Sequence, residues 1–154
     1  MKKKMIIKEQ KGTALVEFAI VLIVLVLLGV GTGEFGLLLY NKQVVTNASR
    51  EGARAGIVRD GINFLDNAGI KQIVKDYCSQ HLIDFKNTAL TDDDIELNPS
   101  DDDIRKTTAF GSDFSVKVTY NYGFLVPSLF NLGNSINITG MTLMKMEQEI
   151  GAGS

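Results

Sequence analysis

The longest feature of the hydrophobic pattern is an apolar run near the N-terminus. Residues 18–33 carry no charge, and extending the run back to Thr13 gives 21 residues interrupted only by Glu17. At about 1.5 Å per helical residue, 21 residues match a hydrocarbon core of roughly 30 Å. The pattern therefore predicts a long helix over residues 13–60, with a membrane part at about 13–40.

Small residues recur at four-residue spacing along this predicted helix. Ala48, Gly52 and Gly56 follow the apolar run, and Gly29 and Gly33 form the same spacing inside it. Side chains four residues apart share one helix face, and small ones let another backbone approach closely. These five positions are therefore predicted to pack against a helix, with glycines merely tolerated in a membrane helix as the alternative.

The rest of the pattern predicts a second helix and a few strands. Apolar residues recur at helical spacing over 68–82, and they alternate strictly with polar ones over 114–122. A short strand is predicted at 94–98 and a last one at 136–147. Because two or three strands are not stable alone, their apolar face should pack on the outer half of the first helix and on the second helix. The predicted fold is α+β and pilin-like, with an extracytoplasmic domain over 61–154 that holds the second helix and a short antiparallel sheet.

Charge is distributed unevenly along the chain. Residues 1–12 contain five lysines and one acid, which leaves 11 basic and 17 acidic residues in the remainder. Lysines before a span favour a cytoplasmic N-terminus, so the acidic remainder is expected outside the cytoplasm. The remainder has no basic footprint of the kind that binds nucleic acid.

Candidate catalytic and metal-binding groups are sparse. Cys78 is the sole cysteine, so an internal disulfide is excluded, and its helical spacing predicts burial rather than an intermolecular bridge or a reactive thiol. His81 has no second ligand at metal spacing. The aspartate runs 92–94 and 101–103 lack the EF-hand pattern and are interpreted as solvated loop rather than a calcium site. We therefore expect no enzyme activity, no cofactor and no metal.

Glu17 is the one acid at the head of the apolar run. An ionised group at the membrane edge is costly and is a functional hypothesis in itself. If the chain is cut between Gly12 and Thr13, the new ammonium of Thr13 lies four residues from Glu17 on the same helix face. The partner of Glu17 is then either this amine or the amine of an adjacent subunit.

Several stretches together resemble a known family. The basic leader, Gly12 followed by TALVEF, with Glu17 as the fifth residue after the cut and Phe18 next, resembles the prepilin-peptidase motif of the Tad/Flp (type IVc) pilus system. VTNASREGARAG at 45–56 and MKME at 144–147 are similar to TadE-like pseudopilins.

The resemblance implies a minor pilin or pseudopilin with a structural or priming role in Tad/Flp pilus assembly, and hence in adhesion, surface attachment or secretion. It implies processing between Gly12 and Thr13 by a TadV-like prepilin peptidase, and assembly through Glu17 and Phe18. Implied partners are other pilin and pseudopilin subunits, an inner-membrane platform with its secretion ATPase, and membrane lipid. The implied location is the cytoplasmic membrane, single-pass, and then a surface pilus. Thr13 departs from the phenylalanine or methionine usual at the first mature position of type IVa pilins, so N-methylation is not implied.

Other interpretations of the N-terminal run stay open. An uncleaved single-span anchor carrying a binding or sensor domain is the main alternative, and a conventional secretory signal cut near Gly29 or Gly31 is another. Gly31, Gly33 and Gly36 also spell GxGxxG, but no βαβ unit surrounds them, which argues against a dinucleotide site.

Overall fold

The protein is described by a computed structural model. Its described residues are 3–60, 63–85, 88–102, 111–124 and 135–146. The chain separates into two compact units, residues 1–36 and residues 37–154, and each is considered by itself.

Helix α1 spans Lys3–Ile57 and contributes residues to both units. It contains no proline, the residue that would remove a backbone hydrogen bond from its interior. The helix ends three residues before the predicted boundary. The reason is a short hairpin, because β1 (Arg59–Asp60) pairs antiparallel with β2 (Asn63–Phe64).

Helix α2 spans Asn67–His81 and begins at a side-chain cap. The Asp66 carboxylate accepts a hydrogen bond from the N–H of Gly69 at 2.9 Å, which satisfies one of the unpaired donors of the first turn. Ile70, Val74 and Cys78 are buried at four-residue spacing. The predicted second amphipathic helix is thereby confirmed.

The sheet has three antiparallel strands in the order β3-β4-β5. A short 3₁₀ helix, η1 (Asp92–Asp94), leads into β3 (Ile95–Asn98), and the two long strands are β4 (Asp113–Gly123) and β5 (Ser135–Lys145). The three predicted strands are therefore present. Residues 125–134, between β4 and β5, lie outside the described part of the chain.

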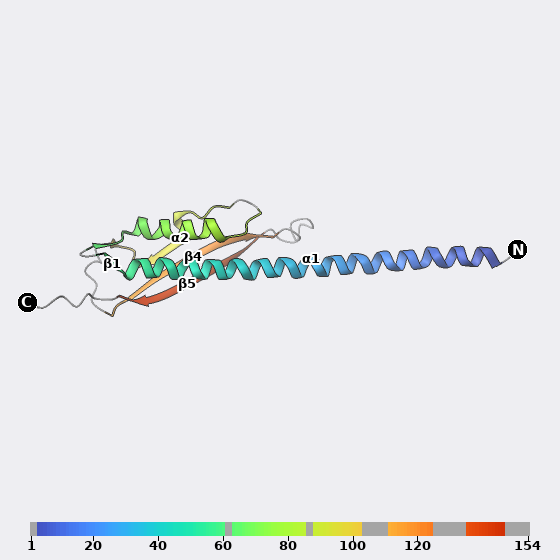
Figure 1. Ribbon diagram of the computed structural model, residues 1–154, viewed down its shortest axis with the longest axis horizontal. Helices are drawn as coiled ribbons and strands as arrows, with labels where there is room; N and C mark the ends of the chain where they lie inside the picture. Colours follow the sequence, from blue (N-terminus) through green and yellow to red (C-terminus); the bar gives the residue numbers. More distant parts are fainter. Residues whose placement is uncertain (1–2, 61–62, 86–87, 103–110, 125–134, 147–154) are drawn as a thin grey trace, which may run out of the picture. The chain divides into compact units, whose positions relative to one another are not determined.

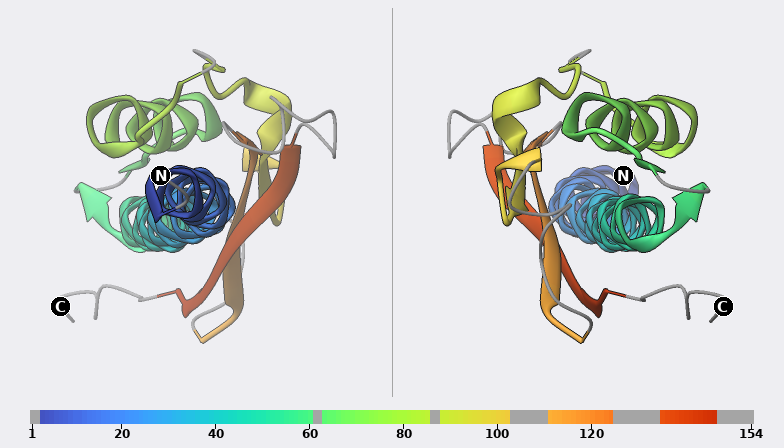
Figure 2. Two further views of the ribbon diagram at one scale, coloured as in Figure 1. Left: turned by 90° about the vertical axis from the view of Figure 1, so that its right-hand side faces the viewer. Right: turned by 90° about the vertical axis from the view of Figure 1, so that its left-hand side faces the viewer.

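The sheet forms one layer of residues 37–154, and the helices form the other. Figures 1 and 2 show α2 and the second part of α1 on the same face of the sheet. The alternating apolar residues of β4 all point into this interface and are buried: Phe114, Val116, Val118, Tyr120 and Tyr122. The predicted α+β class, with strands packed on the outer half of the first helix and on the second helix, is thus confirmed.

Charged pairs hold the register on the opposite face of the sheet. Lys117 Nζ lies 3.0 Å from Glu96 on β3, and Lys145 Nζ lies 3.1 Å from Asp113 on β4. Both join residues that are directly opposite in the register. Such exposed pairs each contribute only about 0.2–1 kcal/mol, so burial of the inner face supplies most of the stability.

Candidate functional site

The first candidate surface is the apolar part of α1 within residues 1–36. Every residue from Gly12 to Gly36 is exposed except Glu34, which is 8% exposed. Large apolar side chains are exposed around the whole circumference, for example Leu15 at 70% and Leu28 at 66%. Among the described residues, α1 is the one helix long and apolar enough to cross a membrane. A helix that is apolar all round requires lipid or other helices around it.

Gly12, Thr13 and Glu17 all lie within the helical part of the chain. Thr13 and Glu17 are one turn apart on α1, so they share a face, as the spacing predicted. Phe18 follows and is 63% exposed. The bond between Gly12 and Thr13 lies inside a helix, and a glycine there weakens the helix by about 1 kcal/mol relative to alanine.

The five small residues singled out by spacing fall into two groups. Apart from the neighbouring backbone of its own helix, a Cβ atom added to Gly29 or Gly33 would meet no atom of the described residues within 4 Å. At Gly52 it would lie 2.5 Å from Val74 Cγ2, and at Gly56 it would lie 2.2 Å from Phe114 Cε1. Gly52 and Gly56 thus receive side chains of α2 and β4 from their own chain.

Ala48 belongs with the second group. It is fully buried in the core of residues 37–154. Among the residues that the structure describes, none fills the space beside Gly29 and Gly33, which leaves that part of the stripe open to a second helix.

Two structural residues of this region were not singled out from the sequence. Asn41 is fully buried on the stripe that continues through Val45 and Ala48. Gly140 lies in β5 where an added Cβ would come within 2.7 Å of Val45 O. Two features of the sequence could have identified them: Asn41 is a polar residue on a helix stripe that is otherwise apolar, and Gly140 is a glycine inside a strand.

A cavity of about 360 Å³ lies between α2, residues 82–84 and 88–90, and β4. Cys78, Asp84 and Tyr120 line it. The Tyr120 hydroxyl is buried and lies beside the carboxylate of Asp84. Burial, and then the charge of Asp84, raises the pKa of Tyr120 above its ordinary value.

The groups around this cavity do not form a nucleophile and base pair. Burial raises the pKa of the Cys78 thiol to about 11, so the thiolate is disfavoured at neutral pH. His81 is exposed, and its Nδ1 lies 2.8 Å from the carbonyl oxygen of Tyr77, on whose ring it stacks. The predicted burial of Cys78 is confirmed.

The acidic loop offers no assembled metal site among the residues described. No three His, Cys, Asp or Glu side chains in these ranges are grouped to hold an ion. Asp92 instead pairs with Lys75 at 2.7 Å, and this hydrogen bond and charge lower the pKa of Asp92. Asp102 accepts a hydrogen bond from the N–H of Asn67 at 3.0 Å. Asp103 lies outside the described residues.

Comparison with known proteins gives a family match. Residues 12–54 match the family described as TadE-like protein. The matched segment includes the predicted processing bond, Glu17 and most of the NASREGARAG block. No curated protein and no solved structure matches the chain.

Proposed function

Since residues 12–54 of this chain are a TadE-like segment, we propose that the protein is a Tad pilus-associated minor pilin that is cut after Gly12 and assembles through α1. The observation that carries this proposal is the exposed apolar surface of residues 12–36, which has one acid at its head. Each large apolar side chain left in water forgoes about 1.5–3 kcal/mol of burial free energy. A membrane covers this surface before assembly, and the helices of other pilin and pseudopilin subunits cover it afterwards.

Glu17 sets the axial position of the subunit during assembly. An ionised carboxylate at the membrane edge is costly, with about 2.5–3.5 kcal/mol for a charged residue at the helix centre as the upper limit on insertion scales. A cut after Gly12 creates an ammonium at Thr13, one turn away, and a neighbouring subunit shifted along the axis brings a second one. Pairing of Glu17 with an ammonium therefore offsets the cost and fixes the axial position of the subunit, with Phe18 packed beside it.

The cut also removes the leader lysines. Five lysines in residues 1–12 hold this end of the chain in the cytoplasm by the positive-inside tendency. A TadV-like prepilin peptidase on the cytoplasmic face would remove all five in one step. The processed helix would then exchange lipid contacts for protein contacts, driven by a membrane platform and a secretion ATPase.

The N-terminal residue of the protein isolated from its native membrane tests the proposal. We expect Thr13 as the first residue, from N-terminal sequencing and intact mass. Gly12→Ala should slow processing, because the substitution strengthens the helix at the bond to be cut. Glu17→Ala should be processed but impaired in assembly, and Glu51→Ala, a change at an exposed acid of residues 37–154, serves as the matched control.

Two results would overturn this function. Retention of residues 1–12 in the native protein would instead support an uncleaved single-span anchor that carries a binding or sensor domain. Normal processing of Gly12→Ala together with normal surface pili from Glu17→Ala would contradict both roles.

A further inference from the structure

Large apolar side chains are exposed at one end of residues 37–154. Leu39 and Tyr40 lie on α1, Phe85 lies shortly after α2, and Ile136 is the second residue of β5. These four side chains are 45–54% exposed. Exposed apolar surface that gathers in one place is typical of a site that lipid or another protein covers.

Hydrogen bonds to α1 place the segment that follows α2 at this end. The Asn41 side chain bonds both the C=O and the N–H of Ile83, so Ile83 lies beside the turn of α1 that carries Tyr40. Phe85 comes two residues later. The carboxylate of Asp84, between them, accepts a hydrogen bond from the N–H of Thr88. An acid in this segment is thus engaged within the chain, while Phe85 is exposed.

Contacts between α1 and β5 place Ile136 at the same end. Lys42 Nζ donates to Thr139 O, and Ser49 Oγ lies 2.7 Å from Thr142 Oγ1. From 42 to 49 on the helix and from 139 to 142 on the strand, the chain rises about 10 Å in both cases. The two elements therefore run alongside each other in the same direction. Ile136 precedes Thr139 by three residues and lies about 10 Å further toward the beginning of the domain at Leu37.

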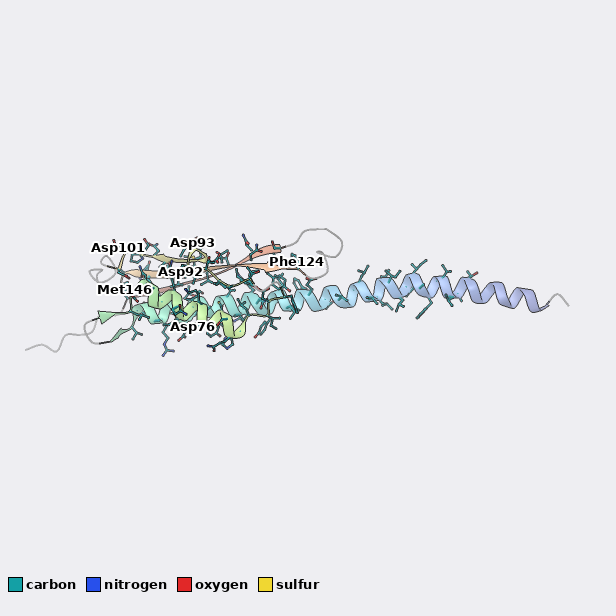
Figure 3. All side chains as sticks on the ribbon, turned by 90° about the horizontal axis from the view of Figure 1, so that it is seen from above. Asp76, Asp92, Asp93, Asp101, Phe124 and Met146 are labelled. Carbon is teal, nitrogen blue, oxygen red and sulfur yellow. The ribbon has the colours of Figure 1, made fainter. Side chains whose placement is uncertain are left out.

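The acidic side chains lie toward the other end of the sheet. Phe124 directly follows β4, and Figure 3 shows it at one end of the sheet, with Asp101 and Met146 toward the other. The remaining labelled residues in that view are aspartates that lie between these ends: Asp76, Asp92 and Asp93. The end that carries Tyr40, Phe85 and Ile136 is therefore apolar and aromatic in character.

The length of the apolar segment determines where the membrane surface falls on α1. The proposed function puts Glu17 at the inner edge, so the hydrocarbon core begins at about residue 18. About 20 helical residues cross a core of about 30 Å, which ends it near residue 37. The headgroup layer adds about 5–8 Å, or about three to five helical residues. Leu39 and Tyr40 then lie in this layer, where tyrosine is enriched in membrane proteins.

We infer that the end of the domain formed by Tyr40, Phe85 and Ile136 docks on the outer headgroup layer of the membrane that α1 spans. The inference rests on the proposed function, because it requires α1 to be a membrane span. The three side chains continue the exposed apolar surface of α1 onto two further segments of the chain, and the length of the span brings them to the lipid. Docking holds the domain against the membrane until assembly withdraws the subunit.

Quenching of a fluorescent label by lipid tests this docking in the full chain. The protein is reconstituted in phosphatidylcholine vesicles whose acyl chains are brominated near the headgroup, and a single cysteine is labelled in a Cys78→Ala background. We expect strong quenching with Phe85→Cys and Ile136→Cys. Met141→Cys is the matched control, because Met141 is also an exposed apolar residue of β5 but lies about 17 Å further along the strand. Its label should be quenched weakly.

A substitution at the docked surface should shift the equilibrium. With the label on Ile136→Cys, Phe85→Ser should lower the ratio of docked to undocked molecules about tenfold, since the burial of one large apolar side chain is lost. Leu65→Ser is the control and should leave the ratio unchanged, because Leu65 is an exposed apolar residue that precedes the opposite end of α2. An effect of Leu65→Ser as large as that of Phe85→Ser would overturn the docking.

A label at Leu28→Cys reports on the span itself. Quenching at Leu28 with equally weak quenching at Phe85, Ile136 and Met141 refutes the docking alone, whereas no quenching at Leu28 refutes the membrane span of the proposed function. Labels at Phe85 and Ile136 that neither the brominated lipid nor aqueous iodide reaches would show that another protein subunit covers this end. That result would also overturn the docking.

Discussion

Asn41 and Ile83 exchange two hydrogen bonds across 42 positions of sequence. The Asn41 Nδ2 donates to Ile83 O at 2.7 Å, and the Ile83 N–H donates to Asn41 Oδ1 at 3.0 Å. Asn41 is fully buried, so its side chain replaces water as the partner of the Ile83 backbone. The pair attaches the segment that follows α2 to helix α1. Asn41 lies at one end of the part of α1 that is packed within residues 37–154.

Asn41→Ala should therefore destabilise residues 37–154. The substitution removes the partner of two part-buried backbone groups of Ile83, and an unsatisfied group that is buried costs about 1–3 kcal/mol. We expect a loss of about 2–4 kcal/mol in the free energy of unfolding, measured by urea denaturation of the full chain in detergent with circular dichroism as the signal. Gln43→Ala, a change at an exposed residue of the same helix, is the control. A loss no larger than that of the control would show that the pair is dispensable.

Gly52→Ala should also destabilise, and a second substitution should restore stability. The new methyl group would overlap Val74 Cγ2, and overpacking of a core costs about 1–3 kcal/mol. Val74→Ala opens space at that point, so the double variant should lose less than the sum of the two single losses. Thermal unfolding of the four chains gives the coupling. Strict additivity would mean that Gly52 and Val74 do not share this contact.

Gly33→Ala, unlike Gly52→Ala, should not destabilise residues 37–154. Beyond the adjacent backbone of α1, no atom in the described part of the chain lies within 4 Å of the added Cβ, and alanine is the better helix former by about 0.8–1.0 kcal/mol. Unfolding of residues 37–154 should be unchanged. If Gly33 contacts a second helix, assembly into pili should fall while processing stays normal. Assembly equal to that of the unaltered protein would remove Gly33 from the packing surface.

The order and type of the main elements follow from local patterns. The alternation from Phe114 to Tyr122 predicts both the strand and its buried face, because side chains of a strand point to opposite sides in turn. Helical spacing in the same way predicts burial of Val74 and Cys78. These features depend only on neighbours in the sequence, so a single sequence is enough to predict them.

Contacts between distant residues could not be predicted in this way. Nothing near Asn41 indicates that its partner is the backbone of Ile83. The spacing of Gly52 and Gly56 predicts close approach, but it does not distinguish a neighbouring subunit from Val74 and Phe114 of the same chain. The hairpin at Arg59–Asp60 is too short to leave any periodicity, and so the predicted end of the first helix was three residues late.

Gly140→Ala should be more damaging than Gly52→Ala. At Gly140 an added Cβ would lie 2.7 Å from Val45 O and 2.8 Å from the Cα of Thr46, and both are backbone atoms. A backbone cannot move aside as the end of a side chain can, so α1 and β5 would have to separate. We expect a loss of about 3 kcal/mol, at the upper end of overpacking costs, and no rescue by Val74→Ala. Thr139→Ala, at the preceding position of β5, is the control in the same unfolding experiment.

Alkaline pH should weaken the fold through Cys78 and Tyr120. Burial raises the pKa of Cys78 from 9.0 to about 11, and it also raises the pKa of Tyr120. Above pH 9.0 the thiol loses its proton in the unfolded chain while it keeps it in the folded one, so the unfolded state binds fewer protons and stability falls as pH rises. The contribution of Cys78 is complete below pH 9.0 and is lost as the pH rises to about 11.

The free energy of unfolding of Cys78→Ala and of Tyr120→Phe should therefore decline less steeply over this range than that of the unaltered chain. The exposed variant Ser79→Ala should decline as the unaltered chain does, and parallel curves for all four proteins would show that neither buried group is linked to folding.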